Sequence, residues 1–171
     1  MIKTPSWSDA RVIQIYVDAD ACPVKEEIYR VAKRHGLPVH VVSNSRITLP
    51  RNPLFRSVIV SGQFDAADDW IVEETTATDV AITADIPLAA RCLQKGSRVL
   101  DPKGRVFSAD SIGDALASRE ISAFLRDMGE VGGGPKPFSP QDRSRFLGAL
   151  ENQIQALLKL ERSKPLPPTS L

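Results

Sequence analysis

Cysteine is scarce in this sequence, with only Cys22 and Cys92 among 171 residues. Two cysteines are too few for a disulfide framework, so we expect reduced thiols. The first residues, MIKTPSWSDAR, lack the apolar segment of a secretory signal. No stretch approaches the roughly 20 apolar residues of a membrane span. We therefore expect a cytoplasmic protein that does not enter a membrane.

Neither sign of charge is in excess. Lys and Arg total 22 against 21 Asp and Glu, which gives a net charge of +1. This balance excludes a strongly basic nucleic-acid coat protein, although a local basic patch is compatible with it. The two histidines, His35 and His40, stand at a predicted helix end and in a predicted strand, and they form no catalytic set. The segment GGGPKP lacks the Gly-Lys-Ser/Thr of a phosphate-binding P-loop.

Predicted strands and helices alternate along the chain. Apolar, β-branched runs indicate strands over 11–18, 38–43, 57–62 and 79–83. Helical periodicity and glycine stops indicate helices over 24–35, 65–74 and 87–96, and Glu26 and Arg30 are spaced to pair on the first. We expect a hairpin over 98–108 and a helix or helix pair over about 111–128. This order predicts an α/β fold with a mostly parallel sheet, flanking helices and right-handed crossovers.

The C-terminal part predicts one more helix. Ser139 is a good N-cap, Pro140 suits the first helical position, and Asp142 stands three residues after the cap. An apolar face continues through Phe146, Leu150, Ile154 and Leu157, so we expect this helix to dock on the domain. The expected organisation is an N-terminal extension (1–10), a single domain (11–162) and a Pro-rich disordered tail (163–171).

Aspartates follow three of the predicted strands. Because the carboxyl ends of parallel strands form one edge of a sheet, these acids should meet there. Clustered carboxylates repel one another, and a divalent cation removes that penalty. A set of oxygen ligands without His or Cys favours Mg²⁺ or Mn²⁺ over Zn²⁺. Each aspartate alone could instead cap a helix or turn, as we expect for Asp65. The predicted metal ligands are Asp18, Asp20, Asp68, Asp69 and Asp85.

Polar and basic residues near this edge are candidates for substrate contacts. The loop after the second strand carries Arg46, Arg51 and Arg56, which either hold phosphates or are simply solvated. Residues at a helix N-terminus can also bind a phosphate, although packing and capping explain them almost as well. The candidates for substrate binding are Lys25, Asn44, Arg46, Thr83, Lys136 and Arg143. Cys22 lies where a helix begins, and the helix dipole there favours its thiolate.

Four motifs in order, VDADACPVK, DAADDWI, ITADIPLA and GGPKPFSPQDRSRF, resemble the YaiI/YqxD family of uncharacterised bacterial proteins. The resemblance covers roughly residues 12–158. The order of acids is also similar to PIN-like domains, including the NYN branch, which are Mg²⁺- or Mn²⁺-dependent ribonucleases. This second resemblance implies a PIN-like three-layer sandwich. It implies metal-binding roles for Asp18, for Asp68 or Asp69, and for Asp85, with Asp20 as an addition of the YaiI/YqxD family.

Three functions remain open on the sequence. The first is a metal-dependent phosphodiesterase acting on RNA, or less readily on DNA, with Asp18, Asp20 and Asp85 as catalytic residues. The second is a phosphatase of the haloacid-dehalogenase kind, in which Asp18 of the Asp-x-Asp pair is the nucleophile. Cys22 and the position of Lys95, at a predicted helix end, both depart from that pattern. The third is a nucleic-acid-binding module that retains a metal site without turnover.

Overall fold

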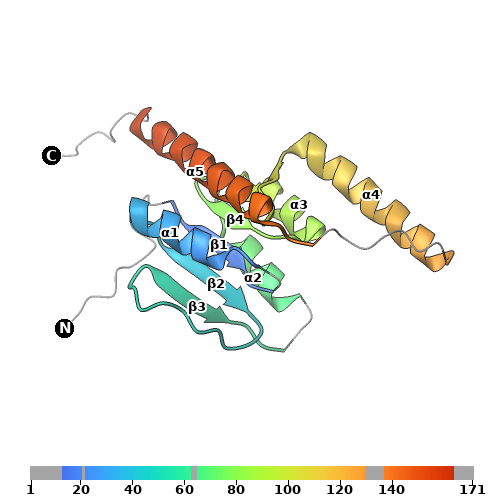
Figure 1. The fold of residues 1–171 in the computed structure, drawn as a ribbon, viewed down its shortest axis with the longest axis horizontal. Coiled ribbons are helices and arrows are strands. Elements are labelled where there is room, and N and C mark those ends of the chain that lie inside the picture. The colour runs from blue at the N-terminus through green and yellow to red at the C-terminus, as the bar shows by residue number, and fades with distance from the viewer. Residues whose placement is uncertain (1–12, 21, 63–64, 130–136, 164–171) are drawn as a thin grey trace.

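Six strands form one sheet in the order β3-β2-β1-β4-β5-β6. The structure, a computed structural model, describes residues 13–20, 22–62, 65–129 and 137–163 (Figure 1). The strands are β1 (Ile15–Asp18), β2 (Val39–Ser43), β3 (Phe55–Ile59), β4 (Val80–Ile82), β5 (Arg98–Leu100) and β6 (Val106–Phe107). The helices are α1 (Lys25–His35), α2 (Ala66–Glu74), α3 (Ile86–Gln94), α4 (Ala109–Asp127) and α5 (Pro140–Ser163).

Strands β1 to β5 are parallel, as the alternation of elements predicts, and β1 lies at the centre. The chain builds outward from β1 through β2 to β3, and α2 then carries it back to β4 on the other side of β1. The strand order therefore reverses between β1 and β4. In open α/β sheets this switch point is where ligands bind, outside the carboxyl ends of the strands.

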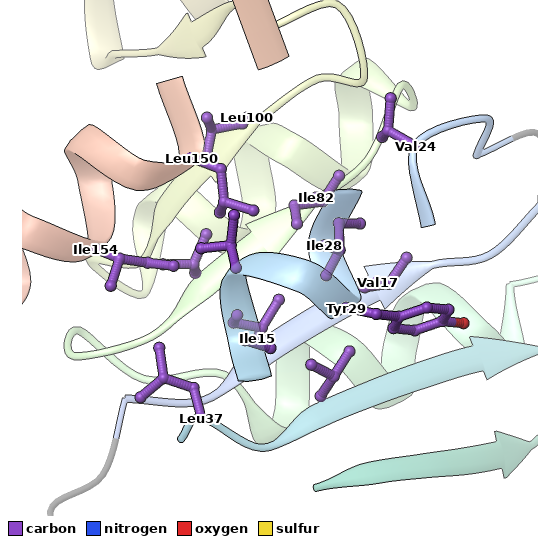
Figure 2. Close-up of a cluster of buried hydrophobic side chains, with 14 of the residues drawn as sticks. Ile15, Val17, Val24, Ile28, Tyr29, Leu37, Ile82, Leu100, Leu150 and Ile154 are labelled. Atoms are coloured by element: carbon purple, nitrogen blue, oxygen red, sulfur yellow. The ribbon is translucent and has the colours of Figure 1, made fainter. Parts of the chain in front are cut away.

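Helices cover both faces of the sheet, so the fold has three layers, with α1 and α5 on one face and α2 and α3 on the other (Figure 1). Alternation along β1 creates the two cores, because Ile15 and Val17 belong to one and Tyr16 to the other. Figure 2 shows the first core, where Leu150 and Ile154 of α5 lie beside Leu100 and Ile82 of the sheet.

Helix α5 docks as its apolar periodicity predicts. Its predicted capping box is confirmed, because the Ser139 amide donates to Asp142 Oδ2 (3.0 Å) and the Asp142 amide donates to Ser139 Oγ (3.1 Å). His35, near the end of α1, bonds to Glu151 of α5 at 2.9 Å. The apolar face is buried, with Phe146, Leu150, Ile154 and Leu157 each at most 4% exposed.

The predicted hairpin is also confirmed, and its turn contacts α5. Strands β5 and β6 pair antiparallel, and Asp101 Oδ1 accepts the amides of Lys103 and Arg105 across the turn. Gly104 has φ +88°, in the left-handed region, and a Cβ built there would stand 2.7 Å from the carbonyl carbon of Arg145. Only a residue without a Cβ fits this close approach of turn and helix.

Helix α4 packs on the body only through its beginning. Ile112 is buried, whereas Ile121 and Phe124, and Met128 directly after the helix, are each more than 60% exposed. Figure 1 shows the second half of α4 extending away from the sheet. The expected helix or helix pair over 111–128 is thus one helix, Ala109–Asp127.

Some predicted boundaries need correction. Strand β3 spans Phe55–Ile59 rather than 57–62, so Arg56 lies within the strand and not in the preceding loop. Glu26 and Arg30 form no ion pair within the described part of the chain. Residues 1–12 and 164–171 lie outside the described residues, while Ser163 ends α5. Among the described residues, no helix combines the length and the apolar character needed to cross a membrane.

Candidate acidic site at the carboxyl edge of the sheet

The switch point between β1 and β4 is bridged by two polar side chains. Asp18 is the last residue of β1, and Thr83 directly follows β4. The Thr83 hydroxyl donates to Asp18 Oδ2 at 2.9 Å, and Thr83 itself is buried. Neighbouring parallel strands thus end in a hydroxyl–carboxylate pair, which fixes the orientation of the Asp18 side chain.

Asp85 lies two residues beyond Thr83 and directly precedes helix α3. Its backbone amide donates to Thr83 Oγ1 at 3.0 Å, and its Oδ1 accepts the amide of Leu88 at 3.0 Å. The second contact is an N-cap, so the helix-cap alternative holds for Asp85. Through Thr83, the cap of α3 is connected to the carboxylate at the end of β1.

Asp68 joins this edge from the first turn of α2. Burial, together with the charges of Asp85, Asp18 and Asp65, raises its pKa to about 6, while Arg91 acts in the opposite direction. Burial also raises the pKa of Asp18, with Asp20 and Asp85 contributing in the same direction. Three acids from separate segments, Asp18, Asp68 and Asp85, are therefore close enough to act on one another electrostatically.

The other two predicted ligands differ from these three in exposure. Asp20 is exposed beside Asp18. Asp69 is also exposed, and its Oδ1 lies 2.9 Å from the guanidinium of Arg91 on α3. Sequence reasoning missed Arg91, because a single cation in the apolar segment IPLAARCLQ gives no sign of which helix it will face. The arrangement groups Asp18, Asp68 and Asp85, with Asp20 at the margin and Asp69 turned to Arg91.

The donor set suits a hard divalent cation, although the acids stand apart from one another. Within the described ranges, no three His, Cys, Asp or Glu side chains lie close enough to hold a metal ion as they stand. Mg²⁺ keeps several of its waters and takes one or two carboxylates together with substrate phosphates. Asp18 and Asp85 have carboxylates at the switch point, and the raised pKa values of Asp18 and Asp68 are what a nearby cation would reverse.

The predicted substrate-binding residues divide by position. Lys25 is the first residue of α1, and Asn44 and Arg46 are exposed in the loop that leaves the carboxyl end of β2. Lys136 lies outside the described residues. Arg143 has structural partners, since its guanidinium donates to Glu27 Oε1 and to the Pro23 carbonyl, both at 2.9 Å.

The environment of Cys22 differs from the sequence prediction. The cysteine is buried, and this burial raises the pKa of its thiol. The helix dipole therefore does not produce a stabilised thiolate at this position. Lys95, the C-cap of α3, donates its ammonium to the carbonyl of Val72 near the end of α2 at 3.0 Å.

Comparison with known proteins identifies the family. Residues 16–156 match the model of the "Uncharacterized BCR, YaiI/YqxD family". The chain is 51% identical over 161 residues to a UPF0178 protein of Rhodopseudomonas palustris (strain HaA2), covering 94% of this chain and 96% of the relative. It is 54% identical over 152 residues to a UPF0178 protein of Brucella ovis, covering 88% and 92%. No solved structure matches. The chain belongs to the YaiI/YqxD family of uncharacterised bacterial proteins.

Proposed function

We propose that this protein is a metal-dependent phosphodiesterase that cleaves RNA at the acidic edge of its sheet. The observation that supports this most strongly is the grouping of Asp18, Asp68 and Asp85, from three segments of the chain, at the β1–β4 switch point. Half-buried acids such as Asp18 and Asp68, whose pKa values are raised by burial and by neighbouring acids, are typical of functional sites. The likeness of their order to PIN-like nucleases points to the same chemistry, with DNA as the less favoured substrate and the cytoplasm as the compartment.

Each residue of the site has a distinct part in this proposal. Asp18 and Asp85 would hold Mg²⁺ or Mn²⁺, with Asp68 and the exposed Asp20 completing the negative edge. A bound divalent cation supplies a water activated for attack and offsets the charge that develops on the phosphate. Thr83 keeps the Asp18 carboxylate oriented by donating to Oδ2. No residue becomes covalently modified.

The environment of the site favours this reading over a haloacid-dehalogenase phosphatase. Such an enzyme needs a lysine beside its nucleophilic aspartate, whereas the candidate Lys95 donates to backbone carbonyls at the end of α2. The position two residues after the second aspartate is the buried Cys22. A non-catalytic nucleic-acid-binding module is the remaining alternative, and turnover separates it from the proposal.

The test is cleavage of a fluorescent single-stranded RNA by the full-length protein with Mg²⁺, Mn²⁺ or EDTA. We expect cleavage that requires the metal and is abolished by Asp18→Asn, whereas Asp114→Asn, an exposed acid on α4, leaves it unchanged. RNA binding without cleavage, whether metal is present or not, would assign the protein to the non-catalytic class. Trapping of an aspartyl-phosphate mimic on Asp18 with a phosphate analogue such as beryllium fluoride would assign it to the phosphatases.

A further inference from the structure

A hollow with positively charged walls lies on the outer surface of α1, away from the acidic edge. Its volume is about 420 Å³, and its lining is Glu26, Tyr29, Arg30, Lys33 and Arg34. Three of these five side chains are cationic and one is anionic. The surface is therefore locally basic although the whole chain has a net charge of only +1.

The cations share one side of α1 because residues three and four apart are neighbours on a helix. Arg30, Lys33 and Arg34 are all exposed. Arg30 makes no ion pair with any described residue, and the Arg34 guanidinium, 54% exposed, lies 3.5 Å from Glu151. The charges are thus only partly neutralised by the protein and remain available to an anion.

An aromatic wall supports this hollow. The ring of Tyr29 packs on Phe55, the first residue of β3, with centroids 4.6 Å apart, and the Lys33 ammonium lies 5.7 Å from the Phe55 ring. Figure 2 shows the Tyr29 ring projecting from α1 on the edge of the first core. Because Tyr29 is itself buried, it forms a wall and leaves no face on which a base could stack.

The direction of α1 connects the hollow with the acidic edge. The helix joins the carboxyl end of β1 to the start of the parallel strand β2, so it runs from the acidic edge back along the sheet. It begins at Lys25, five residues after Asp20, and Arg34 lies about 13–14 Å further along at 1.5 Å per residue. Positive charge therefore follows α1 from beside the site to its far end.

We propose that this hollow binds the phosphate backbone of single-stranded RNA, so that the strand follows α1 on leaving the acidic edge. The identity of the polymer rests on the function proposed above. Guanidinium groups match phosphate geometry with paired donors, and Lys33 adds a point charge. Without a stacking surface, the contacts are to phosphates and carry no sequence preference.

The experiment measures binding without turnover. A labelled single-stranded RNA is titrated with full-length protein in EDTA at several KCl concentrations. The variant of the hollow, called the groove variant, is Arg30→Gln/Lys33→Gln/Arg34→Gln, and glutamine is a good helix former on α1. Each lost phosphate contact reduces the slope of log K against log salt by about 0.7, so we expect a reduction of roughly 2. The control variant, Arg119→Gln/Lys159→Gln/Arg162→Gln, also removes three positive charges, one on α4 and two on α5. It should keep the wild-type slope.

Equal slopes for the groove and control variants, or no RNA binding by the wild type, would overturn the inference. The inference would also be overturned if the groove variant lost binding to anionic phospholipid vesicles but still bound RNA like the wild type. Hydrolysis of bis(p-nitrophenyl) phosphate with Mn²⁺ separates this failure from that of the proposed function, since so small a diester does not reach the hollow. If the wild type hydrolyses the small diester but the groove variant keeps the wild-type salt slope, only the inference of RNA binding in the hollow is rejected. If the groove variant has a reduced salt slope but the wild type hydrolyses no diester, only the proposed phosphodiesterase function is rejected.

Discussion

The hydroxyl of Thr83 and the carboxylate of Asp18 connect two strands at the point where the chain changes direction across the sheet. Asp18 combines burial with two acidic neighbours, and both effects disfavour its charged form. Thr83 offsets part of this cost by donating to Oδ2. A carboxylate kept in such a position lowers the stability of the protein without metal, which is the usual signature of a group retained for function.

This leads to a prediction for Asp18→Asn. The amide oxygen can still accept from Thr83, while the buried charge is removed, so the free energy of unfolding without metal should rise at pH 7–8. The wild type should gain about 2.7 kcal/mol when Mn²⁺ stands at a hundred times its dissociation constant, and the variant much less. Thermal unfolding with and without Mn²⁺ checks both parts. A lower stability without metal, together with an intact Mn²⁺ response, would make Asp18 purely structural.

The raised pKa of Asp68 gives the protein a specific pH dependence. In the folded state the pKa is about 6, above the ordinary value of 3.8, so between these values the folded state binds more protons than the unfolded one. The contribution of this group is therefore fully present below pH 3.8 and is lost as pH rises towards 6. Because ligands must be deprotonated, Mn²⁺ affinity should increase over the same range. Calorimetric titrations from pH 5 to 7 should show this increase, and it should be smaller in Asp68→Asn.

Gly104 is a position where both the backbone and its surroundings require glycine. A side chain there would be strained at φ +88° and would meet the Arg145 backbone at 2.7 Å. We expect Gly104→Ala to cost at least the roughly 1–3 kcal/mol of a strained residue. Gly113→Ala on α4 meets nothing within 4 Å and should be neutral or stabilise by about 0.5–1 kcal/mol. Urea unfolding of both variants is the measurement. Equal unfolding midpoints for Gly104→Ala and Gly113→Ala would show that the turn does not lie in close contact with α5.

Helix α5 stabilises the domain as an element, because its apolar face completes the core over β1 and β5. Leu150 is fully buried in this core. Leu150→Ala should therefore lower the free energy of unfolding by about 2–5 kcal/mol. Leu160→Ala, at a position that is 51% exposed on the same helix, should change it far less. Similar losses from the two substitutions would mean that α5 is not docked in solution.

The contact between α5 and α1 also gives Arg143 a structural role. Glu27 is buried, and Arg143 is its ion-pair partner at 2.9 Å. Arg143→Ala should destabilise the fold because it leaves a buried carboxylate unpaired, and the added change Glu27→Gln should recover part of that loss. A double-mutant cycle by chemical unfolding measures the coupling. If the single change leaves stability intact and weakens only RNA binding, the phosphate-binding role predicted for Arg143 gains support.

Much of the whole molecule followed from local patterns. Strand periodicity and turn signals predicted the parallel sheet, the hairpin and the docked helix, because these features depend on residues near one another in sequence. The acids at the carboxyl ends could be expected together for the same reason, since parallel strands align their ends. The roles assigned to Asp18 and Asp85 as metal ligands stay predictions.

What the sequence did not indicate depends on contacts between distant segments. The ion pair of Arg91 with Asp69 requires knowing how α2 and α3 face each other. Burial of Cys22, which reverses the expected effect of the helix dipole, comes from the packing of the first core. The Phe55 ring that packs against Tyr29 and Lys33 beside the basic hollow belongs to β3, whereas local reasoning placed Phe55 outside any strand.

The docking of α5 has a consequence during synthesis. The core over the central strand is closed by α5, the last helix within the described residues, and Leu157 lies 57 residues after Leu100. At about 5–20 residues per second, the ribosome needs roughly 3–11 s between these two positions. During that interval the nascent chain carries a nearly complete sheet with one apolar face that α1 covers only in part. Chaperones recognise such an apolar surface, and it aggregates when crowded. Slow translation of the segment before Pro140 would lengthen this exposure.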